Sequence, residues 1–441
     1  MARLAALPKV ERRFPPPLGI FAAWRLHAYG YAIAAIYAAF LIAVYRAGTW
    51  LIDGAGVPVY TDFACAWAAA VQALQGGAAA LYDPAEFVKV QAALVGPRDY
   101  FYPNWPYPPT FFLILAPFTV LPYRYAFIAW DMATLLGLIV VVYCIVRKLP
   151  AVALVLASPF TMWNFLAGQN GFLTGSLLGA SLLLLERQPV LAGIFIGALT
   201  YKPQFGILLP LALAAARQWR AFASAVATAG IFVGISIVVF GIDVWAALPR
   251  ELVAQTGEVL RAGGTDDPAA EWGYIQTVYG VVHSLNGGAA LAWLLQGVTT
   301  SGAAIIVWLV WRSPVRYSLK AATLAAAALI ATPYAFAYDM AAIAVPAALL
   351  ASDQMRHGFL RGEQAMLMAL FGASLAVLVA FGDRPGGITF GSTPIGPLVM
   401  MMLLGVIIRR VCWCAGTRWF PHQGGCRATQ RQSRAYGLTT P

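Results

Sequence analysis

Long apolar segments recur along almost the whole chain and constrain its fold more than any other feature. A membrane-spanning helix needs about 20 mostly apolar residues. Hydrophobic residues make up 61% of the 441 residues and charged residues only 11%, against roughly 25% charged in soluble domains. The clearest segments are 28–46, 124–147, 150–166, 170–186, 219–241, 289–312, 317–332, 339–351, 362–381 and 394–411. The sequence therefore predicts an all-α polytopic membrane protein and excludes a soluble domain with one anchor.

Two further apolar segments allow two topologies. Residues 108–121 are too short to span comfortably, and residues 189–216 are broken by Lys202, Pro203 and Gln204. Either 108–121 is re-entrant and 189–216 is a helical hairpin with Lys202 at its outer end, or 108–121 crosses and 189–216 is one kinked helix. Both alternatives give about 12 transmembrane helices of roughly the required length. Both also place the two termini on the same side.

Charge is distributed unevenly between the tails and the loops. Basic residues dominate both tails, whereas acidic residues dominate the loops 47–107 and 242–288. Lys and Arg collect on the cytoplasmic side of membrane proteins, so both termini are expected in the cytoplasm and both loops outside. The net charge of +11 then reports topology and contact with anionic membrane lipid, not nucleic-acid binding. We expect a cytoplasmic basic tail at 1–27, a single transmembrane domain at 28–411, and a disordered cytoplasmic basic tail at 412–441.

The first outer loop carries two helical patterns. Phe63, Trp67, Ala70 and Leu74 recur at helical spacing within 62–74, which predicts an amphipathic helix lying on the membrane surface. A second helix is expected over 84–94, with Asp83 as its cap and a proline in its first position.

A small group of polar residues is expected at or near membrane depth. A charged side chain is energetically costly there, so each such residue is a candidate for a functional role. Each also has a structural interpretation. Asp62 could cap a helix, Lys202 could extend to a lipid headgroup, and Asp131 could be a hydrogen-bonding partner inside the bundle. Gln169 and Asn170 could form a simple turn between two spans, and Tyr338 and Asp339 could cap a helix.

The order of landmarks in the chain resembles glycosyltransferase family 87, membrane enzymes of the GT-C superfamily. The matching stretches are TDFACAWAAAVQALQGGAAALYDP (61–84), YPPTFFLILAPFTVLP (107–122), GQNGFLTGSLLGASLLLLERQPVLAGIFIGALTYKPQFGILLPL (168–211) and TPYAFAYDM (332–340). The resemblance implies a GT-C-like bundle in the bacterial inner membrane. It implies inverting transfer of a hexose, typically mannose, from a polyprenyl-phosphate sugar to a glycolipid or glycan acceptor at the outer face. It also implies that Asp62 is the general base, with no metal and no cofactor besides the lipid-linked donor.

The expected chemistry agrees with the residues present. An inverting displacement needs one base for the acceptor hydroxyl, and one carboxylate suffices. The departing lipid phosphate needs a cation or hydrogen-bond donors, for which Lys202 is the candidate. The remaining candidate substrate-binding residues are Gln169, Asn170, Tyr107, Tyr338 and Asp339. We expect Asp62, Lys202 and Asp339 to line one outward cavity.

The sequence departs from the family pattern at one motif, and two functions other than glycosyl transfer remain as alternatives. Mannosyltransferases of this family tend to have a histidine-containing motif where this chain has AFAYDM, so Tyr338 and Asp339 would have to substitute. The alternative function is a transporter or flippase of lipid-linked or amphipathic substrates. The third is a polymerase or ligase of surface polysaccharide, for which more Arg or His would be expected in the outer loops.

Overall fold

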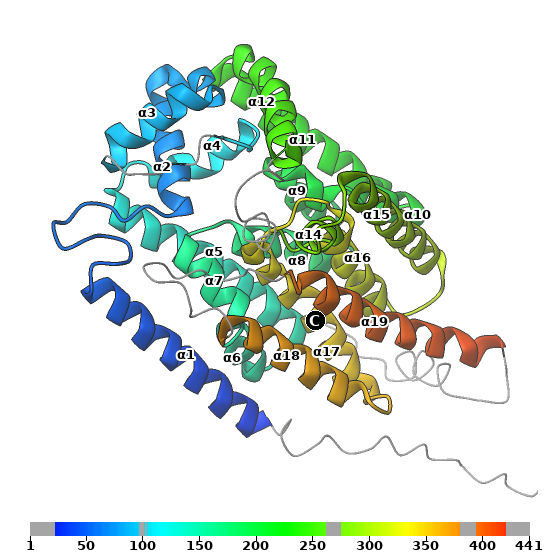
Figure 1. Ribbon diagram of the computed structural model, residues 1–441. Helices are drawn as coiled ribbons and strands as arrows, with labels where there is room; N and C mark the ends of the chain where they lie inside the picture. The colour runs from blue at the N-terminus through cyan, green and yellow to red at the C-terminus, as the bar shows by residue number, and fades with distance from the viewer. Residues whose placement is uncertain (1–22, 97–100, 102–103, 262–274, 380–393, 420–441) are drawn as a thin grey trace, which may run out of the picture.

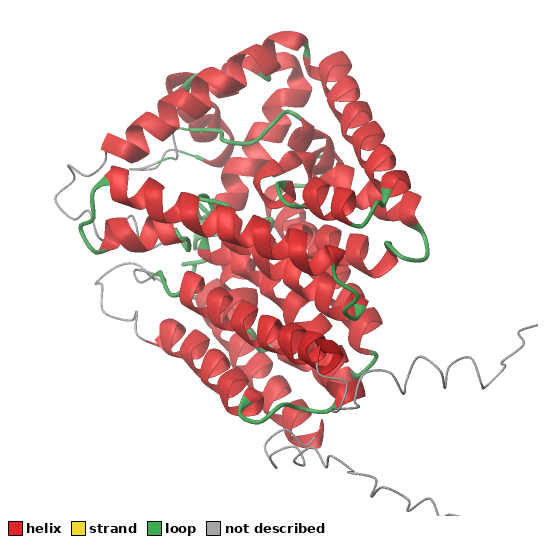
Figure 2. Cartoon of the chain, turned by 90° about the vertical axis from the view of Figure 1, so that its right-hand side faces the viewer, coloured by secondary structure: helices red, strands yellow, loops and turns green. Residues whose placement is uncertain are grey.

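The computed structural model describes residues 23–96, 101, 104–261, 275–379 and 394–419. This part of the chain is helical and contains isolated β-bridges but no strand (Figures 1 and 2). The main helices are α1 (Ala23–Arg46), α2 (Asp62–Gln72), α3 (Pro84–Val95), α4 (Thr110–Leu115), α5 (Tyr123–Val146), α6 (Leu149–Leu156), α7 (Pro159–Ala167), α8 (Gly171–Leu184), α9 (Pro189–Ala198), α10 (Leu209–Ala215), α11 (Trp219–Phe240), α12 (Ile242–Arg261), α14 (Val278–Ser284), α15 (Ala289–Arg312), α16 (Tyr317–Ala331), α17 (Ala344–His357), α18 (Glu363–Val379) and α19 (Gly396–Trp419). The predicted all-α class is confirmed for these residues.

Within the described residues, five helices are long and apolar enough to cross a membrane. They are Trp24–Arg46, Tyr123–Val146, Trp219–Phe240, Ala289–Arg312 and Gly396–Ala415. A sixth candidate is the pair α6 and α7, which is bent by 56° and corresponds to the single span predicted over 150–166. Several other apolar helices have 10–17 residues, so the predicted number of about 12 spans stays a prediction.

The chain reverses direction at Lys202. Helices α9 and α11 run parallel in close contact: a Cβ atom at Gly193 would lie 2.4 Å from the Ala221 carbonyl oxygen, and one at Gly197 would lie 2.5 Å from the Cβ of Thr228. The segment 203–218 must therefore return from the far end of α9 to the start of α11. It does so through α10, which packs against α15. The hairpin alternative for 189–216 agrees with this path, although its two arms are splayed apart.

The segment 108–121 does not connect opposite ends of the bundle. It contains only the short helix α4 and a 3₁₀ turn, Ala116–Phe118. Tyr107 precedes it and hydrogen-bonds Gln169, which in turn bonds Asp62. Tyr123 follows it and hydrogen-bonds Thr61, the residue before Asp62. Both ends of the segment therefore lie beside the start of α2, which agrees with the re-entrant alternative.

The two helices predicted in the first outer loop are present, but the cap of α2 and the surface that its apolar stripe covers differ from the prediction. Asp83 caps α3 as expected, because its Oδ1 accepts from the N–H groups of Ala85 and Glu86. The cap of α2 is Thr61, whose hydroxyl accepts from the Ala64 N–H at 3.3 Å. Asp62 is therefore the first residue inside α2, and its interpretation as the cap is wrong.

The apolar stripe of α2 packs against protein instead of lying on a membrane surface. Phe63 is buried and contacts the rings of Tyr123, Phe127 and Trp130 on α5. Ala70 is also fully buried, and only Leu74 at the end of the stripe is exposed. An apolar stripe satisfies either environment equally well, which is why the periodicity alone gave the wrong partner.

The first and last helices extend beyond the predicted spans, and the predicted domain boundaries stay predictions. Helix α1 begins at Ala23 instead of residue 28, and α19 continues to Trp419 instead of ending at residue 411. Residues 1–22 and 420–441, which include most of the two predicted tails, lie outside the described residues. The second predicted outer loop, 242–288, contains α12 and α14.

Candidate functional site

Asp62 lies in the first turn of α2, which is held in place by hydrogen bonds of Thr61 and of the Asp62 side chain. The Thr61 hydroxyl caps the helix and also hydrogen-bonds the Tyr123 hydroxyl of α5 at 2.8 Å. The Asp62 carboxylate is partly buried, and its Oδ2 accepts a hydrogen bond from Nε2 of Gln169 at 3.1 Å. The side chain is therefore held at a defined position while one carboxylate oxygen keeps capacity for another proton.

Gln169 and Asn170 form the turn between α7 and α8, and Asn164 of α7 shapes this turn. Asn164 Nδ2 donates to the Gln169 carbonyl at 3.0 Å, and its Oδ1 accepts from the Gly171 N–H at 2.8 Å. Gly168 has a φ of 67°, and a Cβ there would lie 2.6 Å from the Cβ of Phe63. Only glycine fits this close approach, which brings the turn against α2.

The turn connects Asp62 to Tyr107 through side-chain amides. Tyr107 donates its hydroxyl proton to Gln169 Oε1 at 3.3 Å. Asn170 Nδ2 donates to the Tyr107 hydroxyl at 3.0 Å. The hydrogen bonds thus run without a gap from Asp62 through Gln169 and Tyr107 to Asn170.

The same chain of hydrogen bonds continues to a buried ion pair. Lys202 Nζ donates to Asn170 Oδ1 at 2.7 Å and to Asp339 Oδ1 at 2.5 Å. Lys202 is 3% exposed and Asp339 is fully buried. The other oxygen of Asp339 accepts from the Phe336 N–H at 3.0 Å, which fixes the 3₁₀ turn Ala337–Ile343. The pairing satisfies both charges at a depth where either alone would be costly.

Aromatic rings surround the Lys202 ammonium. It lies 4.9 Å from the ring centre of Tyr338, 5.4 Å from that of Phe205 and 5.9 Å from that of Tyr107. Rings at these distances attract a cation through their negative faces. The structure therefore brings together all seven residues predicted for the site: Asp62, Tyr107, Gln169, Asn170, Lys202, Tyr338 and Asp339. Their roles in binding and catalysis stay predictions.

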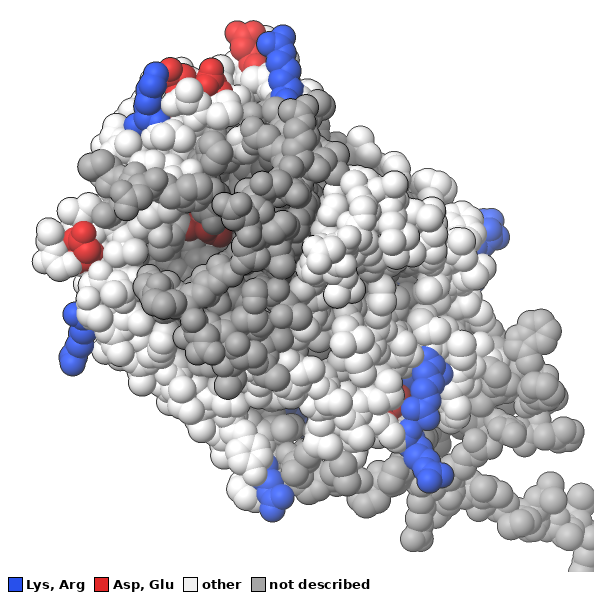
Figure 3. All heavy atoms as spheres, in the orientation of Figure 1, with Lys and Arg blue, Asp and Glu red and all other residues white. Residues whose placement is uncertain are grey.

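Burial sets the acidity of the candidate base. It raises the pKa of Asp62 to about 6, while the Gln169 hydrogen bond and the positive charge of Lys202 act in the opposite direction. A carboxylate with this pKa is mostly ionised at neutral pH and still basic enough to accept a proton in a reaction. Most of the described surface visible in Figure 3 is uncharged, with Lys, Arg, Asp and Glu side chains at scattered positions on it.

Two residues depart from the sequence-based expectations. Asp131 is fully buried in α5, but within the described residues neither carboxylate oxygen has a hydrogen-bond partner, so its interpretation as a bonding partner is wrong. Asn164 was missed, although an asparagine inside the apolar stretch MWNFLAG was a visible signal. No group of three or more His, Cys, Asp or Glu suited to a metal occurs among the described residues.

The comparisons with known proteins identify the family of the chain. No curated protein and no solved structure matches the chain. The model of glycosyltransferase family 87 matches residues 105–333, which is more than half of the sequence and includes Tyr107, Gln169, Asn170 and Lys202. Asp62, Tyr338 and Asp339 lie outside the matched range but are bonded to or packed against residues within it. The chain therefore belongs to glycosyltransferase family 87 and is a membrane glycosyltransferase.

Proposed function

We propose that this glycosyltransferase moves a hexose, mannose by preference, from a polyprenyl-phosphate sugar to a glycolipid or glycan acceptor with inversion at the anomeric carbon. Asp62 acts as the general base. The reaction takes place at the outer leaflet of the bacterial inner membrane, with both termini in the cytoplasm. It needs no metal or organic cofactor, because the lipid-linked sugar is already an activated donor.

The observation that carries this proposal is the position of Asp62 in the hydrogen-bonded chain. Gln169 orients the carboxylate through one oxygen, and the raised pKa keeps it basic near neutral pH. An inverting transfer requires one such group, placed on the side of the sugar opposite to the leaving phosphate. A hydrolase of the common two-carboxylate type would need a second acid beside it. Asp339, the other carboxylate joined to this chain of hydrogen bonds, is already paired with Lys202.

Lys202 is proposed to lie near the donor phosphate. An ammonium group has three N–H donors, and among the described residues Asn170 and Asp339 accept from it. One donor therefore remains for a phosphate oxygen. Because the ion pair with Asp339 already offsets most of its charge, Lys202 would act as an oriented hydrogen-bond donor more than as a free cation.

Tyr107 and Tyr338 are proposed to bind the sugar or the acceptor. Their rings flank Lys202, so they border the space between the proposed phosphate position and Asp62. This supplies polar and aromatic contacts where the family's mannosyltransferases tend to use a histidine. The donor sugar is the part of the proposal that depends most on these two side chains.

Transfer from radiolabelled polyprenyl-phosphate sugars into membrane acceptors tests the function directly. Asp62→Asn keeps the size and the hydrogen-bonding capacity of the side chain but removes the base. We expect the rate to fall by roughly 10²–10⁴-fold, the usual contribution of general acid–base catalysis.

The matched control is Asp83→Asn in the same predicted loop. Asp83 is exposed and caps α3, and asparagine is an equally good cap. This variant should transfer sugar at the wild-type rate. Near wild-type transfer by Asp62→Asn would remove Asp62 as the base, and no transfer by the wild-type protein from any polyprenyl-phosphate sugar would contradict the proposed donor class.

A further inference from the structure

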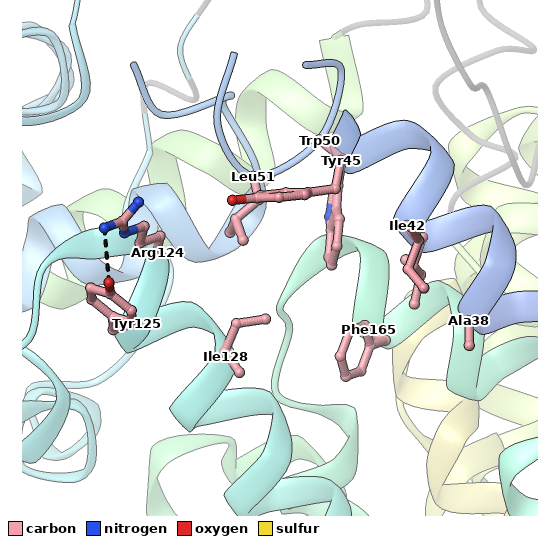
Figure 4. A pocket seen from close by; sticks show the side chains of 10 residues that line it. Ala38, Ile42, Tyr45, Trp50, Leu51, Arg124, Tyr125, Ile128 and Phe165 are labelled. Carbon is pink, nitrogen blue, oxygen red and sulfur yellow. Dashed lines mark hydrogen bonds between the residues drawn. The ribbon is translucent and has the colours of Figure 1, made fainter. Parts of the chain in front are cut away.

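An apolar groove lies between α1 and α5, and none of the residues of the hydrogen-bonded chain lines it (Figure 4). Its volume is about 490 Å³, within the roughly 300–1,000 Å³ of pockets that bind small ligands. Ala38 and Ile42 line it from α1, Ile128 from α5 and Phe165 from α7. Its surface is almost entirely apolar, so its occupant must be a hydrocarbon chain or another apolar group.

The groove opens where two candidate membrane spans separate. Helix α1 packs along α6, with Gly30 against Ala153. Its second half, which carries Ala38, Ile42 and Tyr45, stands away from α5 and leaves the groove between them. Both helices have the length and hydropathy of membrane-spanning segments. A molecule dissolved in the bilayer could therefore enter sideways between them.

One end of the groove carries a cation. Arg124 is exposed in the first turn of α5, at the end where α1 finishes and the chain continues toward Asp62. Its guanidinium donates to the Tyr125 hydroxyl at 2.8 Å and lies over that ring. Among the described residues no carboxylate is paired with it, whereas Lys89 is paired with Glu86 and Lys202 with Asp339. A guanidinium with unused donors is well suited to bind a phosphate.

This charged end adjoins the candidate active site. Tyr123, the residue before Arg124, hydrogen-bonds Thr61, the residue before Asp62. The ring of Phe127 contacts Trp50 of the groove on one side and Phe63 of α2 on the other. A thin aromatic wall thus separates the groove from the first turn of α2. An amphiphile with its chain in the groove would present its headgroup beside that turn.

We propose that the groove between α1 and α5 receives the polyprenyl chain of the sugar donor from the membrane, and that Arg124 captures its phosphate. The inference rests on the proposed function. It adds an entry site on the membrane side, distinct from Lys202, and a residue that acts in donor capture instead of in the chemical step. An apolar chain joined to a single anionic phosphodiester complements a groove that is apolar along its length and cationic at one end.

Steady-state kinetics separate capture from chemistry. We expect Arg124→Gln to raise the KM for polyprenyl-phosphate mannose on the order of tenfold or more, as for a lost hydrogen bond to a charged group. The kcat should stay within about twofold, since Arg124 is not placed at the reacting atoms. Arg124→Lys should recover part of the loss because it keeps the charge but not the fork of donors.

A second variant tests the chain instead of the phosphate. Ile42→Trp fills the groove and should raise the KM for the long-chain donor but not for short-chain citronellyl-phosphate mannose, which has little chain to place. The control is Ile36→Trp on the same helix, because Ile36 is 65% exposed and does not line the groove. Equal effects of Ile42→Trp on both donors, or none on either, would overturn the proposal.

Photolabelling tests the site without any substitution. A donor analogue carrying benzophenone at the end of its chain should label α1, α5 or α7 of the wild-type protein, and excess unlabelled donor should prevent this. Labelling only of helices that do not line the groove, or competition by phosphatidylglycerol vesicles but not by donor, would assign the groove to bulk lipid and overturn the inference. If wild-type protein transfers sugar and Asp62→Asn does not, while all groove experiments are negative, this inference fails and the proposed function stands.

Discussion

At the scale of single residues, the environment of Asp62 determines the conditions under which it can act. The carboxylate must be ionised to accept a proton from the acceptor hydroxyl. Burial disfavours the ionised form and raises its pKa to about 6, whereas the hydrogen bond from Gln169 favours the ionised form. The donor phosphodiester remains ionised throughout this range, so the loss of activity in acid should report Asp62.

We therefore expect kcat/KM for transfer to fall as the pH decreases through about 6, the pKa of Asp62. Gln169→Leu removes the hydrogen bond that stabilises the carboxylate, so the acid limb should move to higher pH. A pH profile of both proteins measures the shift. A wild-type profile that stays flat down to pH 4, or a Gln169→Leu limb that moves to lower pH, would contradict this account.

At the scale of helices, the sequence indicated which segments break but not always what they pack against. Gln169 and Asn170 indicated a turn between two spans, and the structure has one there. The break at Lys202, Pro203 and Gln204 allowed either a hairpin or a kinked helix, and only the structure distinguishes them. Thr61 and Asp62 are both good caps in adjacent positions, so only the structure identifies Thr61. The stripe on α2 likewise carries no information on whether lipid or α5 covers it. The meeting of Asp62, Lys202 and Asp339 depends on contacts across 107 residues, from Asp62 to Gln169, and across 137 residues, from Lys202 to Asp339. It could only be expected from the family resemblance.

The pair of Lys202 and Asp339 joins the reversal after α9 to the 3₁₀ turn before α17. Asp339→Asn leaves the buried ammonium without its counterion and should reduce stability by about 3–5 kcal/mol. The double variant Lys202→Met, Asp339→Leu should regain most of that stability without regaining transfer activity. Unfolding of the detergent-solubilised proteins measures both. If the double variant is less stable than Asp339→Asn, the lost stability comes from the missing ion pair and not from the uncompensated buried charge.

At the scale of the whole molecule, a second buried ion-pair network lies in the C-terminal helices α17 to α19. Arg410 of α19 is 1% exposed and pairs with Glu363 at 2.8 Å and Asp353 at 3.1 Å. Asp353 is also bound by Arg316, which precedes α16. The charge distribution of the sequence placed Arg410 near a cytoplasmic tail. The number of positive charges in a segment does not reveal that Arg410 is buried and connects several helices through its ion pairs.

Arg410→Ala should therefore destabilise the protein by about 3–5 kcal/mol, because Glu363 would be left as an uncompensated buried charge. The control is the adjacent Arg409→Ala, since Arg409 is exposed and such surface changes stay within about 0.5 kcal/mol. Comparison of the two unfolding curves gives the difference. Equal stability of the two variants would mean that the network contributes little to the fold.

The reversal at Lys202 also has a consequence for how the protein is made. Its counterion Asp339 follows 137 residues later, so the ribosome needs on the order of 10 s to supply it at ordinary rates of synthesis. During that interval a lysine in the middle of a continuous span would be stranded in hydrocarbon. At the tip of a reversal the ammonium can remain in water until the last partner is inserted. The broken helix thus lets the nascent chain deliver a charge to the site before its counterion Asp339 has been made.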